Sequence, residues 1–233
     1  DRNGHTYRSD GSVYFKIATL PSYGKLVHLD QEQMKPGARV DTDSYAKDDA
    51  RDFVLWKATR PDEPTWNVVD PPGRPGWHLE CSAMALKHLG EPPIDIHCGG
   101  IDLIFPHHEN EIAQSEGATG KPFSRFWVHV EYLIVDNEKM SKSLGNTYTI
   151  PDIVARGFRP SAVRYLLLSA YYRKQLNFTW ESPGHAEGAL RRLTDCLTRM
   201  EAVTAPGAHP AITTRVEAAR AAFAEAMMHD LNT

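Results

Sequence analysis

The middle of the chain alternates between strand-like segments and a helix-like stretch, and this alternation limits the folds that it can adopt. Residues 94–97 are a candidate for a short buried strand, residues 107–116 are a candidate for a helix, and residues 127–135 are apolar and rich in β-branched side chains. Strand, helix and strand in this order are typical of a parallel sheet, because a helix returns the chain to the start of the next strand. The sequence therefore predicts an α/β domain with a parallel sheet.

Regular patterns continue on both sides of this central part. Strand-like runs occur near residues 11–23 and 53–57, and five prolines within residues 60–75 predict an extended connector. Apolar residues at a helical spacing, or a proline at a first helical position, predict further helices. These are expected at residues 77–89, 106–116, 150–157 and 160–170, and from 185 to the end with a break at 205–210. The predicted α/β domain is thus followed by an α-helical region.

Length, charge and cysteine usage exclude several classes of protein. The chain has 233 residues and no apolar run near the roughly 20 residues that a membrane span needs, so no membrane partner is expected. Its net charge of −4 excludes a general nucleic-acid binder of the strongly basic kind. Three cysteines without framework spacing predict a reducing, cytoplasmic location. The chain begins with Asp1 rather than Met, and we expect it to be a fragment of a longer protein.

Three residues have the chemistry of a metal site. His107 and Glu111 are four residues apart and share one helix face, and Cys81 lies 26 residues earlier on another predicted helix. Thiolate, imidazole and carboxylate ligands together suit zinc better than calcium or magnesium. His108 competes with His107, because it also shares a face with Glu111. Spacing alone leaves a second interpretation open, in which these are solvated helix charges beside a buried thiol.

A loop with two lysines is a second candidate site. Residues 139–143 read Lys-Met-Ser-Lys-Ser and are followed by Gly145, within a charged loop after the predicted strand at 127–135. Ammonium groups on such a loop can neutralise the charge that develops during phosphoryl transfer. By itself the pattern is also common on solvated loops, so the residues alone do not decide between the two interpretations.

Five long stretches of the chain resemble cysteinyl-tRNA synthetases. They cover nearly the whole chain and are specific in sequence. They are RDFVLWK at 51–57, GRPGWHLECS at 73–82, DIHCGGIDLIFPHHENEIAQSE at 95–116, KMSKSLGN at 139–146 and YYRKQLNFT at 171–179. The resemblance implies an α/β fold that is part of a class I Rossmann-type catalytic domain with a parallel sheet, followed by an α-helical region.

The resemblance also divides the chain into four predicted regions. Residues 1–70 correspond to an insertion or connective region of the catalytic domain, and residues 71–128 to the second half of the Rossmann-type domain with the zinc site. Residues 129–183 correspond to the KMSKS loop and the stem-contact region, and residues 184–233 to the start of a helical tRNA-binding domain.

The resemblance implies a zinc site of two cysteines, a histidine and a glutamate. Cys81 matches the second cysteine, His107 the histidine and Glu111 the glutamate, whereas the first cysteine belongs to a segment before this chain. A substrate cysteine can offer a thiolate to zinc, whereas serine offers only a harder hydroxyl. The zinc is therefore expected to select the substrate.

Roles for the remaining site residues also follow from the resemblance. Lys142 matches the lysine that stabilises the ATP triphosphate, Lys139 supports it, and Mg²⁺ is expected to accompany the ATP. Trp77 and His97 are expected to line the cysteine pocket, and Asp102 to bind the substrate ammonium group. The implied activity is cysteine–tRNA ligation, in which ATP activates L-cysteine as its adenylate and the cysteine is then transferred to tRNA(Cys).

Two stretches of the sequence depart from the family pattern, and two other functions compete with cysteine–tRNA ligation. Cys98 stands where the family most often has glycine, and His129–Tyr132 departs from the commoner histidine–x–glycine arrangement.

A cysteine ligase of mycothiol synthesis would share the zinc site and the lysine loop, although residues 80–84 and 108–116 follow the synthetase pattern. A truncated, non-catalytic zinc or RNA-binding module is the other rival. Because the HIGH motif and the first cysteine lie outside this chain, the isolated chain is expected to be inactive.

Overall fold

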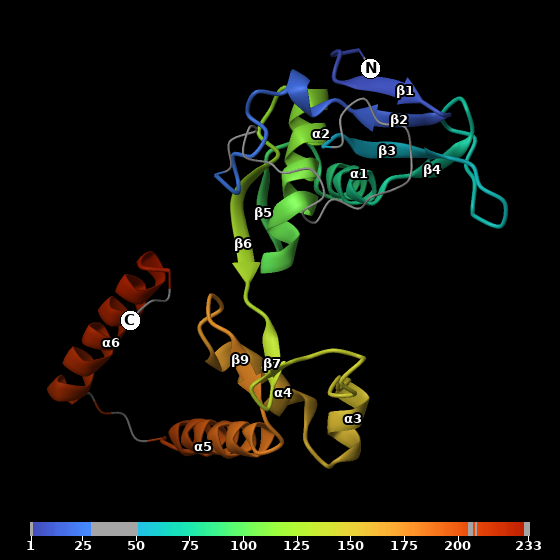
Figure 1. Cartoon of the computed structure of the whole chain (residues 1–233). Coiled ribbons are helices and arrows are strands. Elements are labelled where there is room, and N and C mark those ends of the chain that lie inside the picture. The colour runs from blue at the N-terminus through green and yellow to red at the C-terminus, as the bar shows by residue number, and fades with distance from the viewer. Residues whose placement is uncertain (1, 29–50, 205–206, 208, 231–233) are drawn as a thin grey trace. The chain divides into compact units, whose positions relative to one another are not determined.

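The protein forms two compact units in its computed structural model (Figure 1). The structure describes residues 2–28, 51–204, 207 and 209–230. The first unit spans Asp1–Val130 and the second spans Glu131–Thr233. The finer four-part division of the chain stays a prediction.

An antiparallel sheet forms much of the first unit. Its four strands are hydrogen-bonded in chain order: β1 Thr6–Ser9, β2 Ser12–Phe15, β3 Phe53–Ala58 and β4 Gly73–Pro75. The predicted strand near 11–23 is shorter than expected, because the chain turns into a 3₁₀ helix at Ile17–Thr19. The strand predicted at 53–57 is confirmed as β3.

Among the described residues, the first unit also contains two parallel strands and the helices α1 and α2. Strand β5 (Ile94–Gly100) pairs in parallel with β6 (Ser124–Val130), with His97 opposite Trp127. Helix α2 (Glu109–Thr119) carries the chain between them, and α1 (Trp77–Leu89) packs against α2. The predicted order of strand, helix and parallel strand is therefore confirmed.

The helical stretch that contains α2 begins at Pro106, as predicted. Phe105 has extended dihedral angles (φ −137°, ψ 132°), as is usual for a residue before proline, and it interrupts the segment Ile104–His108. Helical geometry resumes after Phe105 and leads directly into α2, whose regular part begins at Glu109. The helix ends at Gly120, whose φ of +68° suits glycine.

Helix α2 is bound to the antiparallel sheet through apolar and polar contacts. Ala113 is fully buried in a core with Phe15 and Phe53. The Glu109 carboxylate is also fully buried, and its Oε1 accepts a hydrogen bond from the Gly24 N–H at 2.8 Å. Its Oε2 accepts from the Leu26 N–H at 3.0 Å. Burial raises the pKa of Glu109, although these backbone N–H groups oppose the shift.

Replacing Glu109 by Ala is expected to release the turn at residues 24–27 from α2. The substitution leaves N–H groups without an acceptor, and we expect the free energy of unfolding to fall by about 2–4 kcal/mol. Hydrogen exchange measured by mass spectrometry should be faster at residues 24–27. Glu80→Ala, an exposed position on α1, is the matched control and should not change this exchange. Unchanged protection in Glu109→Ala would show that the carboxylate does not hold the turn.

In its described part, the second unit has a small mixed sheet and four helices. Its sheet has the order β8-β7-β9, with β7 antiparallel to β8 and parallel to β9. The strands are β7 Leu133–Val135, β8 Glu138–Lys139 and β9 Leu176–Phe178, and the helices are α3 Ile150–Ala155, α4 Pro160–Ser169, α5 Ser182–Glu201 and α6 Pro210–Met228. The core of this unit joins Val135 and Phe178 of the sheet to Ile153 of α3 and Leu166 of α4.

Two further expectations are corrected in the second unit. The strand predicted at 127–135 is divided at Glu131 and Tyr132, because β6 pairs with β5 while β7 pairs with β8 and β9. Cys196 has a helical spacing with Leu193, Leu197 and Met200 that predicts a core position, but all four residues are exposed on α5. The break expected at 205–210 falls partly outside the described residues. No helix in the described parts of the chain is long and apolar enough to cross a membrane.

Candidate functional site

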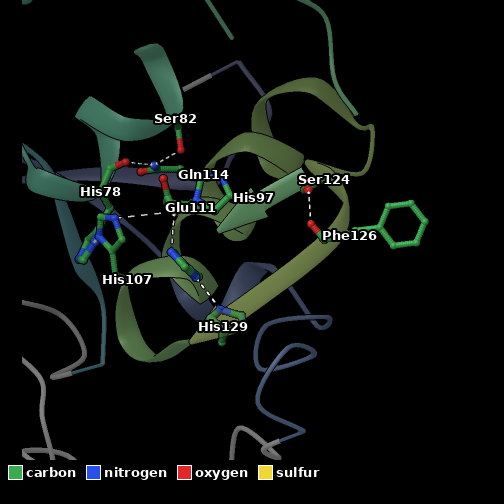
Figure 2. A network of polar contacts seen from close by, with 10 residues as sticks. His78, Ser82, His97, His107, Glu111, Gln114, Ser124, Phe126 and His129 are labelled. Atoms are coloured by element: carbon green, nitrogen blue, oxygen red, sulfur yellow. Dashed lines mark hydrogen bonds and ion pairs between the residues drawn. The ribbon is translucent and has the colours of Figure 1, made fainter. Parts of the chain in front are cut away.

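Helix α1, helix α2 and the helical turn that precedes α2 bring a thiol, an imidazole and a carboxylate together in the first unit. One ligand atom each of Cys81, His107 and Glu111 lies within 4.8 Å of the others. His107 Nε2 is 3.7 Å from Glu111 Oε2, across one turn at the start of α2. Figure 2 shows both side chains in a network that also contains His78 and His97. Residues predicted from spacing and resemblance therefore lie at a single site.

The geometry of this triad fits a metal ion. A tetrahedral zinc with bonds of about 2.0–2.3 Å places its ligand atoms about 3.3–3.8 Å apart, so a small contraction of the triad would let it supply three of the four ligands of one ion. Glu111 is fully buried, and within the described residues its Oε1 has no hydrogen-bond partner. A buried carboxylate oxygen without a partner is costly unless a cation or donor satisfies it. The ligand atoms of Cys81, His107 and Glu111 therefore suit a zinc ion.

A second group of possible ligands shares Glu111. His97 Nε2 is 2.9 Å from Glu111 Oε2, and His108 Nε2 is 3.9 Å from the same oxygen. The other ring nitrogen of His108 lies 2.8 Å from His129 Nε2, so His108 is already part of a hydrogen-bonded pair. Geometry alone permits an ion at either group. The thiol of Cys81 distinguishes the first group, because sulfur favours zinc over hard cations.

The protonation states at the site depend on burial. Burial lowers the pKa of His107, and burial together with neighbouring histidines lowers that of His108 to about 3. Both imidazoles are therefore neutral near pH 7, which is the form that binds metals. Burial and the nearby Glu111 carboxylate raise the pKa of the Cys81 thiol. A cation is needed to hold that sulfur as a thiolate, because its surroundings otherwise favour the protonated form.

Residues outside the triad orient its ligands. His78 Nδ1 is 2.8 Å from His107 Nδ1, so one of these two rings donates a hydrogen bond to the other. Gln114 Nε2 donates to the His78 carbonyl oxygen and to Ser82 Oγ, both at 2.5 Å, and so joins α2 to α1. Such contacts fix the ring orientation of a metal-binding histidine. These partners were not predicted from the sequence. Gln114 could have been suggested by its position one turn after Glu111.

The residues predicted to bind the amino acid have different environments. The Trp77 side chain is 57% exposed, and its ring stacks on that of His107 with centroids 4.2 Å apart, so it is not a core residue. His97 lies on β5 and contacts Glu111. Asp102 is exposed on the 3₁₀ turn after β5. Cys98 is exposed within β5 and belongs to neither ligand group.

The two lysines of the predicted phosphate loop belong to the second unit. Lys139 ends β8, and Lys142 lies in the turn that follows. Both side chains are exposed, and no ion pair involves either lysine among the described residues. Their ammonium groups are therefore available to an anionic ligand. The structure brings Trp77, Cys81, His97, His107 and Glu111 together, and it places the lysines on a separate unit.

An α/β fold of this kind is found in class I tRNA synthetases. The chain resembles Mycobacterium tuberculosis methionyl-tRNA synthetase, solved in complex with methionyl-adenylate, with a TM-score of 0.57 and 18% sequence identity. This likeness covers 94% of the present chain and 48% of the other, and it shows the fold alone. A family described as tRNA synthetases class I (C) catalytic domain matches residues 1–187. The chain belongs to this family.

Similar proteins of known name agree with this assignment. The cysteine–tRNA ligase of Solibacter usitatus is 56% identical over 230 residues, which is 98% of this chain and 49% of the relative. The cysteine–tRNA ligase of Brachyspira hyodysenteriae is 48% identical over 238 residues, which is 99% of this chain and 50% of the relative. The chain spans about half the length of the curated relatives that it matches.

Proposed function

We propose that the chain is part of a cysteine–tRNA ligase, which activates L-cysteine with ATP and transfers it to tRNA(Cys). The observation that carries this proposal is the Cys81, His107 and Glu111 triad, with its ligand atoms within 4.8 Å, in a chain whose relatives include named cysteine–tRNA ligases. A ligase for a thiol-containing amino acid needs a group that distinguishes sulfur from oxygen, and this triad can hold one. A cytoplasmic location is part of the same proposal.

Cys81, His107 and Glu111 would hold zinc, together with a ligand from outside this chain. When bound, zinc supplies a soft Lewis acid that favours the thiolate of a substrate cysteine over the hydroxyl of serine. Trp77 covers the His107 ring and is exposed, so it can also contact a substrate beside the site. His97 holds the Glu111 carboxylate through Oε2 and thereby limits its orientation.

The polar ends of the substrate require separate partners. Asp102 is exposed on its turn and is proposed to bind the ammonium group of cysteine, because an anion is the natural partner of that group. Lys142, supported by Lys139, is proposed to bind the triphosphate of ATP with its Mg²⁺. Attack of the cysteine carboxylate on the α-phosphorus forms the adenylate and releases pyrophosphate. The ammonium groups neutralise the negative charge that develops on the phosphate oxygens.

The acceptor distinguishes this proposal from its nearest rival. A cysteine ligase of mycothiol synthesis would make the same adenylate but transfer cysteine to an amino-sugar. The complete gene product that contains this chain should therefore be given ATP and radiolabelled cysteine with either tRNA or the amino-sugar. We expect label on tRNA and none on the sugar. Transfer to the sugar alone would replace the proposed function by the rival, and no adenylate with either acceptor would favour the non-catalytic module.

A further inference from the structure

The loop that carries both lysines has two anchored ends. Met140 and Tyr148 pack against the hydrophobic core of the second unit, one on each side of the loop. The Tyr148 ring also meets that of Trp180, with centroids 4.6 Å apart. These apolar contacts fix where the loop leaves and rejoins the unit. They do not fix the shape of residues 141–147, which depends on polar contacts within the loop.

Asn146 makes two hydrogen bonds across the base of this loop. Its Oδ1 accepts from the Ser141 N–H at 2.8 Å, and its Nδ2 donates to the Lys139 carbonyl oxygen at 3.1 Å. One side-chain amide thus binds the backbone on both sides of Met140, as a neighbouring strand would. The backbone of Lys139 is held directly, and that of Lys142 is held one residue away.

The rest of the loop is closed by local contacts. The Gly145 N–H donates to the Lys142 carbonyl oxygen at 3.2 Å, and the Leu144 N–H donates to Ser141 Oγ at 3.3 Å. Gly145 has a φ of +66°, which glycine adopts without strain. The second of these contacts uses Ser141, whose backbone Asn146 holds, and the first uses Lys142, which follows Ser141 directly. The lysine side chains take no part in them and remain exposed.

We propose that Asn146 is a positioning residue for the phosphate loop, which aligns Lys139 and Lys142 with the triphosphate of ATP. This inference rests on the proposed function. A carboxamide is required because one group must both accept from Ser141 and donate to Lys139. Aspartate keeps the shape and the acceptor, but it has no donor and adds a negative charge beside an anionic ligand. Asn146 itself acts through the lysines and does not contact the reacting atoms.

Asn146→Ala and Asn146→Asp test this role in the complete gene product. The kcat of cysteine-dependent ATP–pyrophosphate exchange should fall about 10–100-fold, as expected when a reacting group is displaced by about an ångström. The KM for cysteine, the zinc content and the melting temperature should stay unchanged, because the loop belongs to the second unit. Thr147→Ala, an exposed neighbour, is the control and should keep the full rate. A full rate in both Asn146 variants would overturn the inference.

The same substitutions in a Lys142→Ala background separate this inference from the proposed function. If Asn146 acts through Lys142, Asn146→Ala should cost little further activity when Lys142 is already absent. Equal losses in both backgrounds would show that Asn146 does not act through Lys142 and would overturn its assigned role in aligning that lysine. A normal rate in Lys142→Ala alone would overturn the proposed function of the loop and the inference with it. Hydrogen exchange at residues 139–146 should also be faster in Asn146→Asp, and unchanged exchange would contradict the role of the two hydrogen bonds.

Discussion

Replacing Cys81 by Ala in the complete gene product is expected to abolish zinc binding and to raise the KM for cysteine by about 10²–10⁴-fold. Cys81 supplies the soft donor of the triad, and without it the buried Glu111 and the neutral His107 hold an ion poorly. Loss of the ion also removes the partner of the substrate thiolate. The KM for ATP should change little, because Lys139 and Lys142 belong to the other unit.

Elemental analysis and steady-state kinetics measure this effect. Cys98→Ala is a matched control, because Cys98 is an exposed cysteine of the same unit that belongs to neither ligand group. The Cys98→Ala variant should keep the zinc content and the KM for cysteine of the unaltered protein. His107→Ala and His108→Ala then distinguish the two groups around Glu111, and zinc should be lost in the first variant only. Full zinc content in Cys81→Ala would remove Cys81 from the site.

Replacing Lys142 by Ala is expected to lower the kcat of cysteine activation by about 10²–10³-fold, the usual cost of losing one charged contact in a transition state. The Lys142 ammonium group is exposed and makes no ion pair among the described residues, so it is free to meet the triphosphate. Its contribution should grow as negative charge develops on the phosphate oxygens. The KM for cysteine should therefore change far less than kcat.

ATP–pyrophosphate exchange at saturating cysteine measures the effect of Lys142→Ala. Lys174→Ala removes another exposed lysine of the second unit and should leave the exchange rate unchanged. A similar loss in both variants would indicate a general effect of surface charge. A rate close to that of the unaltered protein in Lys142→Ala would mean that the loop does not contact ATP during activation.

The helices and strands of the central region could be predicted from the sequence where the spacing of apolar residues alone defined them. Helix α1 has its predicted bounds, 77–89, because its apolar period is continuous and glycines flank it at 76 and 90. The helical stretch from Pro106 was predicted because proline suits a first helical position, and the extended Phe105 before it agrees with this start. The strand at 127–135 was predicted as one because its apolar run is continuous, but its two halves pair with different strands.

The amphipathic pattern of α5 predicted an apolar face but not its environment. Cys196, Leu197 and Met200 share that face, and all three are exposed in the described part of the chain. Periodicity shows which residues lie on one side of a helix, but it carries no information on what covers that side. The assignment of Cys196 to the core needed a packing partner that the pattern could not supply.

The candidate site was only partly accessible from the sequence. Helical spacing was sufficient to pair His107 with Glu111, but it left His108 as a competitor, and the structure indeed places both near Glu111. Cys81 was a candidate because of its thiol, and the resemblance supported its assignment to the site. The contacts of His78 and Gln114 join two helices that are distant in sequence, so no local pattern could reveal them.

Charging of tRNA(Cys) with cysteine and with serine by the complete gene product is the most direct measurement of the proposed function. The proposed site rewards a bond to sulfur that serine does not offer, so kcat/KM should favour cysteine by about 10⁴-fold or more. Removal of zinc with a chelator should abolish most of this preference, and zinc should restore it. No charging with cysteine, or similar kcat/KM values for the two amino acids in the zinc-loaded protein, would contradict the proposal.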